Sequence, residues 1–86
     1  MMQSALVIGN ATATVKHASL DGWRLIVLQP LDIKDEADGF PVLAIDNLGA
    51  GKGDKVFFTS DGKYVRQLVG RDDSPIRFAV QGMIDG

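Results

Sequence analysis

A glycine-rich segment with a single lysine is the first candidate for chemistry in this sequence. Residues 49–53 read Gly-Ala-Gly-Lys-Gly, and loops of this kind can bind phosphate through backbone N–H groups. The P-loop, however, needs a glycine five positions before the glycine of its Gly-Lys pair and a Ser or Thr after the lysine, whereas this sequence has Asp46 and Gly53 there. The third glycine comes one position too early for the dinucleotide fingerprint. We therefore interpret the segment as a tight connection in which glycine permits a positive φ or a close backbone approach.

The remaining residues with chemical potential are few. His17 is the only histidine and could act as a general base, but no nucleophile or orienting partner accompanies it in the sequence. The acidic residues within 35–38 and 72–73 lie in polar, turn-rich stretches, where solvation explains them. The absence of cysteine excludes disulfides and thiolate metal sites, and a single histidine excludes multi-histidine metal clusters. We predict that the protein is not an enzyme and needs no cofactor or metal.

The charge balance argues against a polyanionic partner. The sequence has 9 basic and 11 acidic side chains, a formal net charge of −2 and a pI near 5.1. Nucleic-acid binding by charge neutralisation needs a concentrated excess of Lys and Arg. The amino terminus has neither the basic start of a signal peptide nor an apolar run close to the roughly 20 residues of a membrane span. We expect a cytoplasmic protein that binds neither nucleic acid nor a membrane.

Turn signals divide the sequence into short apolar runs that could position these residues. Asp-Gly pairs, the glycine cluster and an Asp-Asp-Ser-Pro turn separate stretches rich in β-branched and aromatic residues. These stretches predict strands over residues 5–15, 24–29, 42–46, 55–59 and 78–84. Apolar residues within 60–69 recur at helical spacing instead, which predicts a short helix capped by Ser60 or Asp61 and ended by Gly70.

Five short strands and one brief helix favour an all-β fold. The pattern is typical of a small Greek-key barrel or sandwich, of which the OB-like barrel is the commonest at this size. We therefore expect a small five-stranded OB-like Greek-key barrel with one short helix, as a single domain over residues 1–86. Residues 25–28 and 42–45 are apolar at every position, whereas a half-exposed antiparallel strand alternates. One short helix covers little of their outer faces, so another copy of the chain is the simplest cover. The alternative is that loops of the same chain cover them.

Three segments of the sequence carry a specific combination of motifs. They are a Gln-Pro-Leu-Asp strand end within 27–32, an Ala-Ile-Asp strand with Gly-Ala-Gly-Lys-Gly-Asp after it within 44–56, and a closing Gly-Met-Ile-Asp within 80–85. In order and spacing, nearly end to end, they resemble the EutN/CcmL family of bacterial microcompartment vertex proteins. Many members also carry a Gly/Ser-Ser-x-Ala-Arg stretch near residues 60–66, and there only Arg66 matches.

The resemblance implies a structural shell protein that has an OB-like barrel, forms homo-pentamers and occupies the vertices of a microcompartment in the cytoplasm. Hexameric shell proteins would form the facets, and five-fold units would close the curvature. From the resemblance and the glycine pattern we expect an oligomer interface or pore at Gly49, Ala50, Gly51, Lys52, Gly53, Asp54 and Arg66. The alternative function is a small OB-like module, monomeric or dimeric, that binds a ligand or single-stranded nucleic acid.

Overall fold

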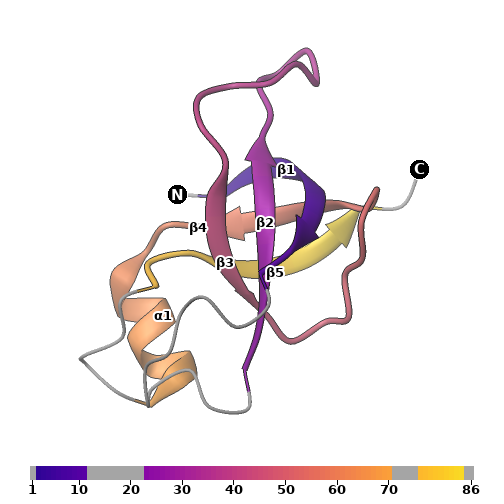
Figure 1. Ribbon diagram of the computed structural model, residues 1–86. Coiled ribbons are helices and arrows are strands. Elements are labelled where there is room, and N and C mark those ends of the chain that lie inside the picture. Colours follow the sequence, from indigo (N-terminus) through magenta and orange to yellow (C-terminus); the bar gives the residue numbers. More distant parts are fainter. Residues whose placement is uncertain (1, 12–22, 71–75, 85–86) are drawn as a thin grey trace.

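The computed structural model of this chain describes residues 2–11, 23–70 and 76–84. Five strands form a closed barrel in the order β1-β2-β3-β5-β4, and one short helix lies beside it (Figure 1). The elements are β1 (Met2–Asn10), β2 (Arg24–Pro30), β3 (Val42–Asp46), β4 (Lys55–Thr59), α1 (Gly62–Val69) and β5 (Ala79–Ile84). In the described part of the chain, no helix is long and apolar enough to cross a membrane.

The expected five-stranded barrel with one short helix is confirmed, and the strand boundaries are close to the predicted ones. The ranges 42–46 and 55–59 agree with the structure, and β2 and β5 differ from their predictions by one residue at one end. The first strand begins earlier, at Met2, and ends at Asn10 rather than at 15, although residues 12–15 lie outside the described part. His17 and the acidic pair at 72–73 also lie outside it.

The barrel closes through one long strand and one brief parallel contact. β1 pairs with both β2 and β4 in antiparallel fashion, so Ala5 is opposite Pro30 on one side and Val56 on the other. β3 and β5 meet in parallel at Ile45 and Ala79. The register of β1 against β2 and of β4 against β5 shifts once each, and bulges of this kind increase strand bending.

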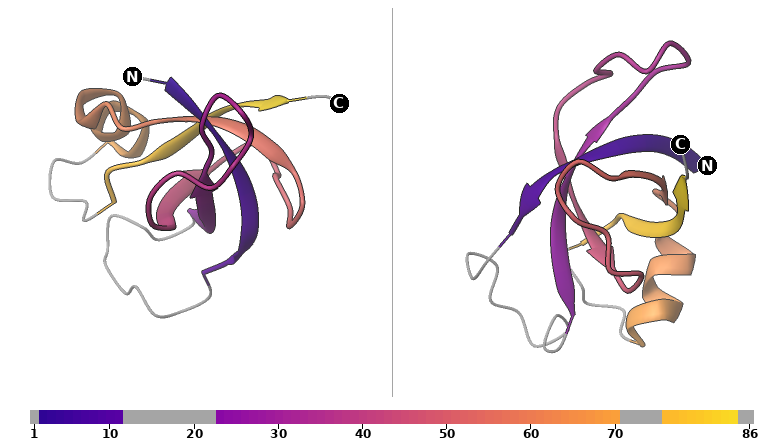
Figure 2. Two further views of the ribbon diagram at one scale, coloured as in Figure 1. Left: turned by 90° about the horizontal axis from the view of Figure 1, so that it is seen from above. Right: turned by 90° about the vertical axis from the view of Figure 1, so that its right-hand side faces the viewer.

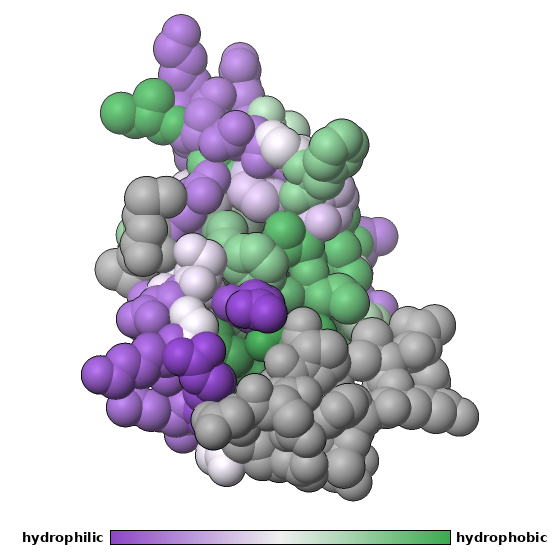
Figure 3. Space-filling view, turned by 90° about the vertical axis from the view of Figure 1, so that its left-hand side faces the viewer, coloured by the Kyte–Doolittle hydropathy of each residue, from purple (hydrophilic) through white to green (hydrophobic). Residues whose placement is uncertain are grey.

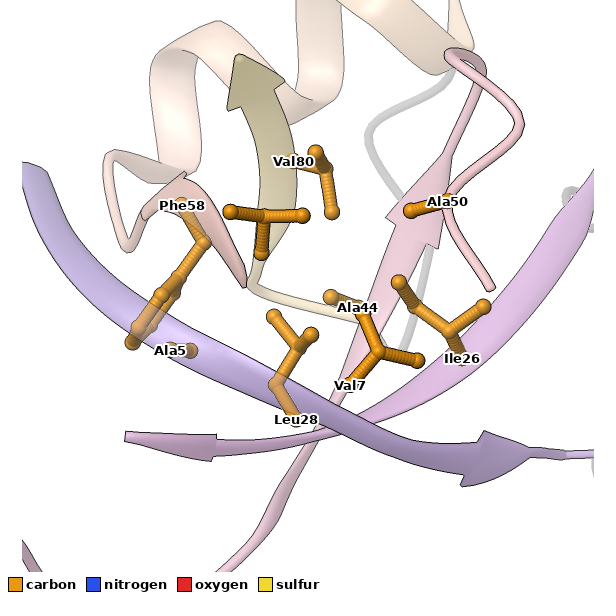
Figure 4. Packing of buried hydrophobic residues seen from close by; sticks show 9 residues of the cluster. Ala5, Val7, Ile26, Leu28, Ala44, Ala50, Phe58 and Val80 are labelled. Carbon is orange, nitrogen blue, oxygen red and sulfur yellow. The ribbon is translucent and has the colours of Figure 1, made fainter. Parts of the chain in front are cut away.

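The barrel interior holds the main hydrophobic core. Side chains from all five strands and from the β3–β4 connection meet there (Figure 4), and their inward direction follows the two-residue alternation of each strand. Phe58 packs edge-on against Phe78, with ring centroids 5.8 Å apart. The buried members are Ala5, Val7, Ile26, Leu28, Ala44, Ala50, Val56, Phe58 and Val80.

A second cluster covers part of the outer face of the barrel. Leu25 and Ile45 point outward from β2 and β3, and Val65 of α1 packs with them as a fully buried residue. The helix of the same chain therefore covers these two residues, so the predicted cover by another copy concerns only the other outer-face residues of the two strands. Val27 and Leu43, also on the outer face, remain half-buried.

Residues at both ends of α1 explain why the helix lies where it does. The carboxylate of Asp61 accepts a hydrogen bond from the backbone N–H of Lys63, and this identifies Asp61 rather than Ser60 as the N-cap. Gly70 ends the helix in the left-handed conformation, with φ of 80°, and donates its N–H to the carbonyl of Arg66. The predicted short helix and its terminating glycine are thus confirmed.

Candidate functional site

The β3–β4 loop (residues 47–54) contains most of the expected site residues, and a buried carboxylate fixes its first half. Asp46 ends β3 with a side chain that has no exposed surface. Its Oδ1 accepts the N–H of Leu48 at 3.0 Å, and its Oδ2 accepts the N–H of Ala50 at 2.9 Å. The loop therefore turns around one carboxylate, and this turn carries Ala50 into the barrel core.

Arg24 completes the arrangement from the neighbouring strand. Its Nη1 lies 2.6 Å from Oδ2 of Asp46 and also donates to the carbonyl oxygen of Ala50, while Nη2 donates to Oδ1 of Asn10 at 3.1 Å. One guanidinium thus joins the ends of β1, β2 and β3 to the loop. A buried carboxylate without a partner is costly, and the pairing with Arg24 offsets the cost of burying the Asp46 carboxylate. We call Asp46 and Arg24 the loop clamp.

The second half of the loop is attached to β1 by backbone hydrogen bonds. Gly53 donates its N–H to the carbonyl of Val7 at 2.8 Å, and Val7 donates its own N–H to the carbonyl of Asp54 at 2.9 Å. The Asp54 carboxylate accepts the N–H of Gly51 at 2.8 Å. Several N–H groups that would cradle a phosphate are therefore already bonded to acceptors of this chain, and two of these acceptors are carboxylates. The loop is therefore poorly suited to bind an anion.

The three glycines of the loop meet different backbone requirements. Gly49 and Gly53 have φ values of 82° and 93°, which favour glycine, so the predicted need for positive φ is confirmed at these two positions. Gly51 does not have a positive φ, and a Cβ there would lie 3.9 Å from Oδ2 of Asp54. Close backbone approach, the other expected reason for glycine, is therefore not found within this chain at any of the three positions.

The expected site residues do not gather in one place. Lys52 is exposed at the turn of the loop, and Gly49 to Asp54 form one continuous surface segment apart from buried Ala50. Arg66 is exposed on α1. The loop and the helix lie on opposite sides of the barrel in Figure 1 and again in the view from above in Figure 2.

Two features of this region were not predicted from the sequence. The loop clamp is one, because Arg24 and Asp46 are 22 positions apart and meet only through the pairing of β2 with β3. A cation opposite an aspartate at the end of a strand is a signal that could have suggested it. The other is the projecting β2–β3 loop (residues 31–41), in which Ile33 and Phe40 are almost wholly exposed. Among the described residues, no group of three or more His, Cys, Asp or Glu could hold a metal ion.

Comparisons of sequence identify relatives of one kind. A family model described as ethanolamine utilisation protein EutN/carboxysome matches residues 2–85. The bacterial microcompartment shell vertex protein EutN of Escherichia coli K12 is 36% identical over 84 residues, which are 98% of this chain and 87% of the relative. The shell vertex protein GrpN of Rhodospirillum rubrum is 39% identical over 79 residues, which are 92% of this chain and 88% of the relative.

Comparisons of structure give the same result. The GrpN pentameric microcompartment shell protein from Rhodospirillum rubrum superposes with a TM-score of 0.80 at 34% identity, over 98% of this chain and 94% of that one. CcmL from Nostoc sp. superposes with a TM-score of 0.81 at 36% identity, over 96% of this chain and 88% of that one. The similarity therefore covers the whole barrel and the helix, not one shared motif.

Proposed function

The chain belongs to the EutN/CcmL family, and from this premise we propose that it is a structural shell protein whose pentamers occupy the vertices of a bacterial microcompartment. The observation that carries the proposal is the end-to-end similarity to shell vertex proteins, including one whose solved structure is described as pentameric. Flat hexameric tiles cannot close a shell, and five-fold units supply the missing curvature. The protein is then a component of the shell of a cytoplasmic compartment, without catalytic activity.

The β3–β4 loop and α1 are the two surfaces through which we propose that neighbouring copies meet. A cyclic ring is heterologous, which means that each copy presents two different surfaces, one to each neighbour. The loop and the helix lie on different sides of the barrel, so each can face a different neighbour (Figures 1 and 2). Lys52 and Arg66 are exposed there and available to a neighbour. We propose the oligomer interface or pore at Gly49, Gly51, Lys52, Gly53, Asp54 and Arg66, whereas the expectation for Ala50 is corrected, because its side chain is buried in the barrel core of its own chain.

The exposed apolar surface of the barrel supports assembly. Ile8, Leu48, Phe57 and Met83 are each about two-fifths to one-half exposed. Figure 3, a view of the side that carries the helix, shows a hydrophobic area over the barrel with hydrophilic residues above it and to its left. A stable interface buries about 800 Å² per partner, which is roughly 15% of the 5290 Å² accessible on one chain. Two such contacts per copy would cover about a third of that surface.

The partners proposed here are four further copies of this chain and the hexameric shell proteins that surround a vertex. We also propose that residues 1–86 act as one domain, since the family match spans nearly all of them. A small OB-like module that binds a ligand or nucleic acid is the weaker alternative, because the sequence lacks a basic excess and the glycine loop bonds its own N–H groups.

Light scattering coupled to size exclusion tests the proposal. We expect a mass close to five chains of 9.2 kDa each and no retention of a single-stranded oligonucleotide at moderate salt. A monomer or dimer whose mass stays constant over the accessible concentration range would contradict the vertex function. Oligonucleotide binding by such a monomer would favour the alternative module instead.

A further inference from the structure

The β2–β3 loop carries two large apolar side chains that the chain itself leaves uncovered. Ile33 is 100% exposed and Phe40 is 88% exposed, more than the other large apolar side chains of the described residues. The loop projects from one end of the barrel (Figures 1 and 2), and in Figure 3 this end is mostly hydrophilic with hydrophobic atoms at its margin. Single apolar residues are common on protein surfaces, but two large ones that stay almost wholly exposed on one ordered loop offer apolar contact area to a partner.

Hydrogen bonds order the tip of this loop. Oδ1 of Asp32 accepts the N–H groups of Lys34 at 2.8 Å and Glu36 at 3.0 Å, and the N–H of Asp32 donates to the carbonyl of Glu36. Asp35 adopts the left-handed conformation, with φ of 61°. The turn around Ile33 is therefore built from local bonds.

Further contacts fix the loop to the barrel. Lys55 at the start of β4 forms an ion pair with Asp35, with Nζ 2.6 Å from Oδ2. The side-chain amide of Gln3 donates to Asp38, and that of Gln29 donates to the carbonyl of Gly39. A loop held in this way loses little conformational entropy when it binds, and this favours docking as a rigid unit.

The charge of the loop restricts what it can contact. Residues 32–38 contain four acidic side chains and one lysine, which gives a formal charge of −3 from 1 − 4. A second loop of the same kind would be repelled, so like loops of neighbouring copies should not face each other. The complementary surface is an apolar recess with Lys or Arg at its rim.

The position of the loop argues against a contact within the ring. In Figure 1 and in the view from above in Figure 2, the loop rises between the β3–β4 loop on one side and α1 on the other. If these two surfaces join copies around a ring, the β2–β3 loop points away from both of them and takes no part in the ring contacts. This step rests on the proposed function.

We propose that the β2–β3 loop is a docking element for a neighbouring shell protein of a different kind, into whose cation-rimmed apolar recess Ile33 and Phe40 insert. The loop then joins the vertex ring to the surrounding hexameric tile. The acidic residues near the two apolar groups orient the contact, and their attraction to the rim weakens as salt screens it.

The double variant Ile33→Ser and Phe40→Ser tests the proposal, with Lys34→Ser on the same loop as the matched control. The measurements are ring mass by light scattering and affinity for the purified hexameric protein of the same shell, at low and at high salt. We expect the double variant to keep the five-chain mass and to bind the hexamer at least about 10-fold more weakly, as loss of two buried apolar anchors implies. Lys34→Ser should bind within about two-fold of the parent chain.

Three results would overturn the docking role while leaving the vertex function intact. The double variant could bind the hexamer as tightly as the parent chain does, or the parent ring could show no affinity for the hexamer. In the third case, the ring of the double variant dissociates. The last would show that the loop contacts a second copy. A parent chain that forms no ring contradicts the vertex function and this proposal together, and the mass measurement alone reveals it.

Discussion

At the scale of single residues, Asp46 shows how a buried carboxylate can have a structural role without any part in catalysis. Its side chain has no exposed surface, yet it accepts two backbone N–H groups and pairs with Arg24. A buried charge is tolerated when its hydrogen-bonding capacity is filled in this way. The clamp therefore fixes the loop that we propose as a contact surface.

Replacement of Asp46 by Ala should destabilise the fold. The change leaves the N–H groups of Leu48 and Ala50 without their acceptor and removes the partner of Arg24, so we expect a loss of about 2 to 4 kcal/mol in the free energy of unfolding. Urea denaturation at fixed protein concentration measures it. The control is Lys55→Gln, which breaks the exposed pair with Asp35 and should cost less than about 1 kcal/mol. Equal losses for the two variants would contradict the clamp.

Gly51 offers a test that separates assembly from folding. A Cβ at this position would lie at an ordinary contact distance, 3.9 Å, from Oδ2 of Asp54, and φ is not positive, so one chain should accommodate a side chain there. If the loop contacts a neighbouring copy, Gly51→Val should abolish the five-chain mass while circular dichroism shows a folded barrel. Gly53→Ala is the comparison, because its φ of 93° should cost about 1 kcal/mol in folding by itself. A Gly51→Val chain with unchanged mass and melting temperature would place the loop outside the contact.

At the scale of elements, α1 is short but structurally necessary. It has eight residues, and isolated helices of this length are unstable in water. Packing of Val65 against Leu25 and Ile45 stabilises it, and in return the helix covers an apolar part of the barrel wall. The sequence predicted the helix and its end but not this contact, because spacing within a segment does not reveal which strands lie beneath it.

The N-cap of this helix can be tested directly. Asp61→Ala removes the acceptor for the N–H of Lys63, and we expect a loss of about 1 kcal/mol, or a fall of roughly 4–8 °C in melting temperature for a domain of this size. Ser60→Ala should change stability by no more than about 0.5 kcal/mol, since Ser60 is exposed and is not the cap. A larger effect at Ser60 than at Asp61 would show that the helix begins one residue earlier.

Strands were easier to predict than the contacts between them. The ranges 42–46 and 55–59 followed from apolar runs between turn signals, and both agree with the structure. The pairing of β3 with β5, which closes the barrel, joins residues 34 positions apart, 79 − 45. No local pattern encodes such a contact. For the same reason the sequence indicated Gly49 and Gly53 as turn glycines but did not reveal the clamp from Arg24.

At the scale of the whole molecule, a barrel of 86 residues has a limited capacity to stabilise itself. Domains of this size bury only about 60 to 65% of the surface that the unfolded chain exposes. The interior cluster and the α1 cluster bury many of the described apolar side chains, but Val27 on the outer face of β2 belongs to neither cluster and is half-buried. Assembly is therefore expected to contribute to the stability of each chain.

If folding is coupled to ring formation, thermal stability must depend on protein concentration. For five chains that unfold together, a 100-fold rise in concentration adds about 2 kcal/mol per chain by mass action, so the melting temperature should rise by several degrees.

Val27→Lys places a charge on the outer face of β2, and burial of an unpaired charge costs several kcal/mol. We expect this variant to lose both the five-chain mass and the concentration dependence. Ile33→Lys adds the same charge at a fully exposed site outside the proposed ring contact and should retain both. A Val27→Lys chain that behaves like Ile33→Lys would show that the outer face of β2 is not covered in the ring, and the half-buried valine would then be an ordinary surface residue.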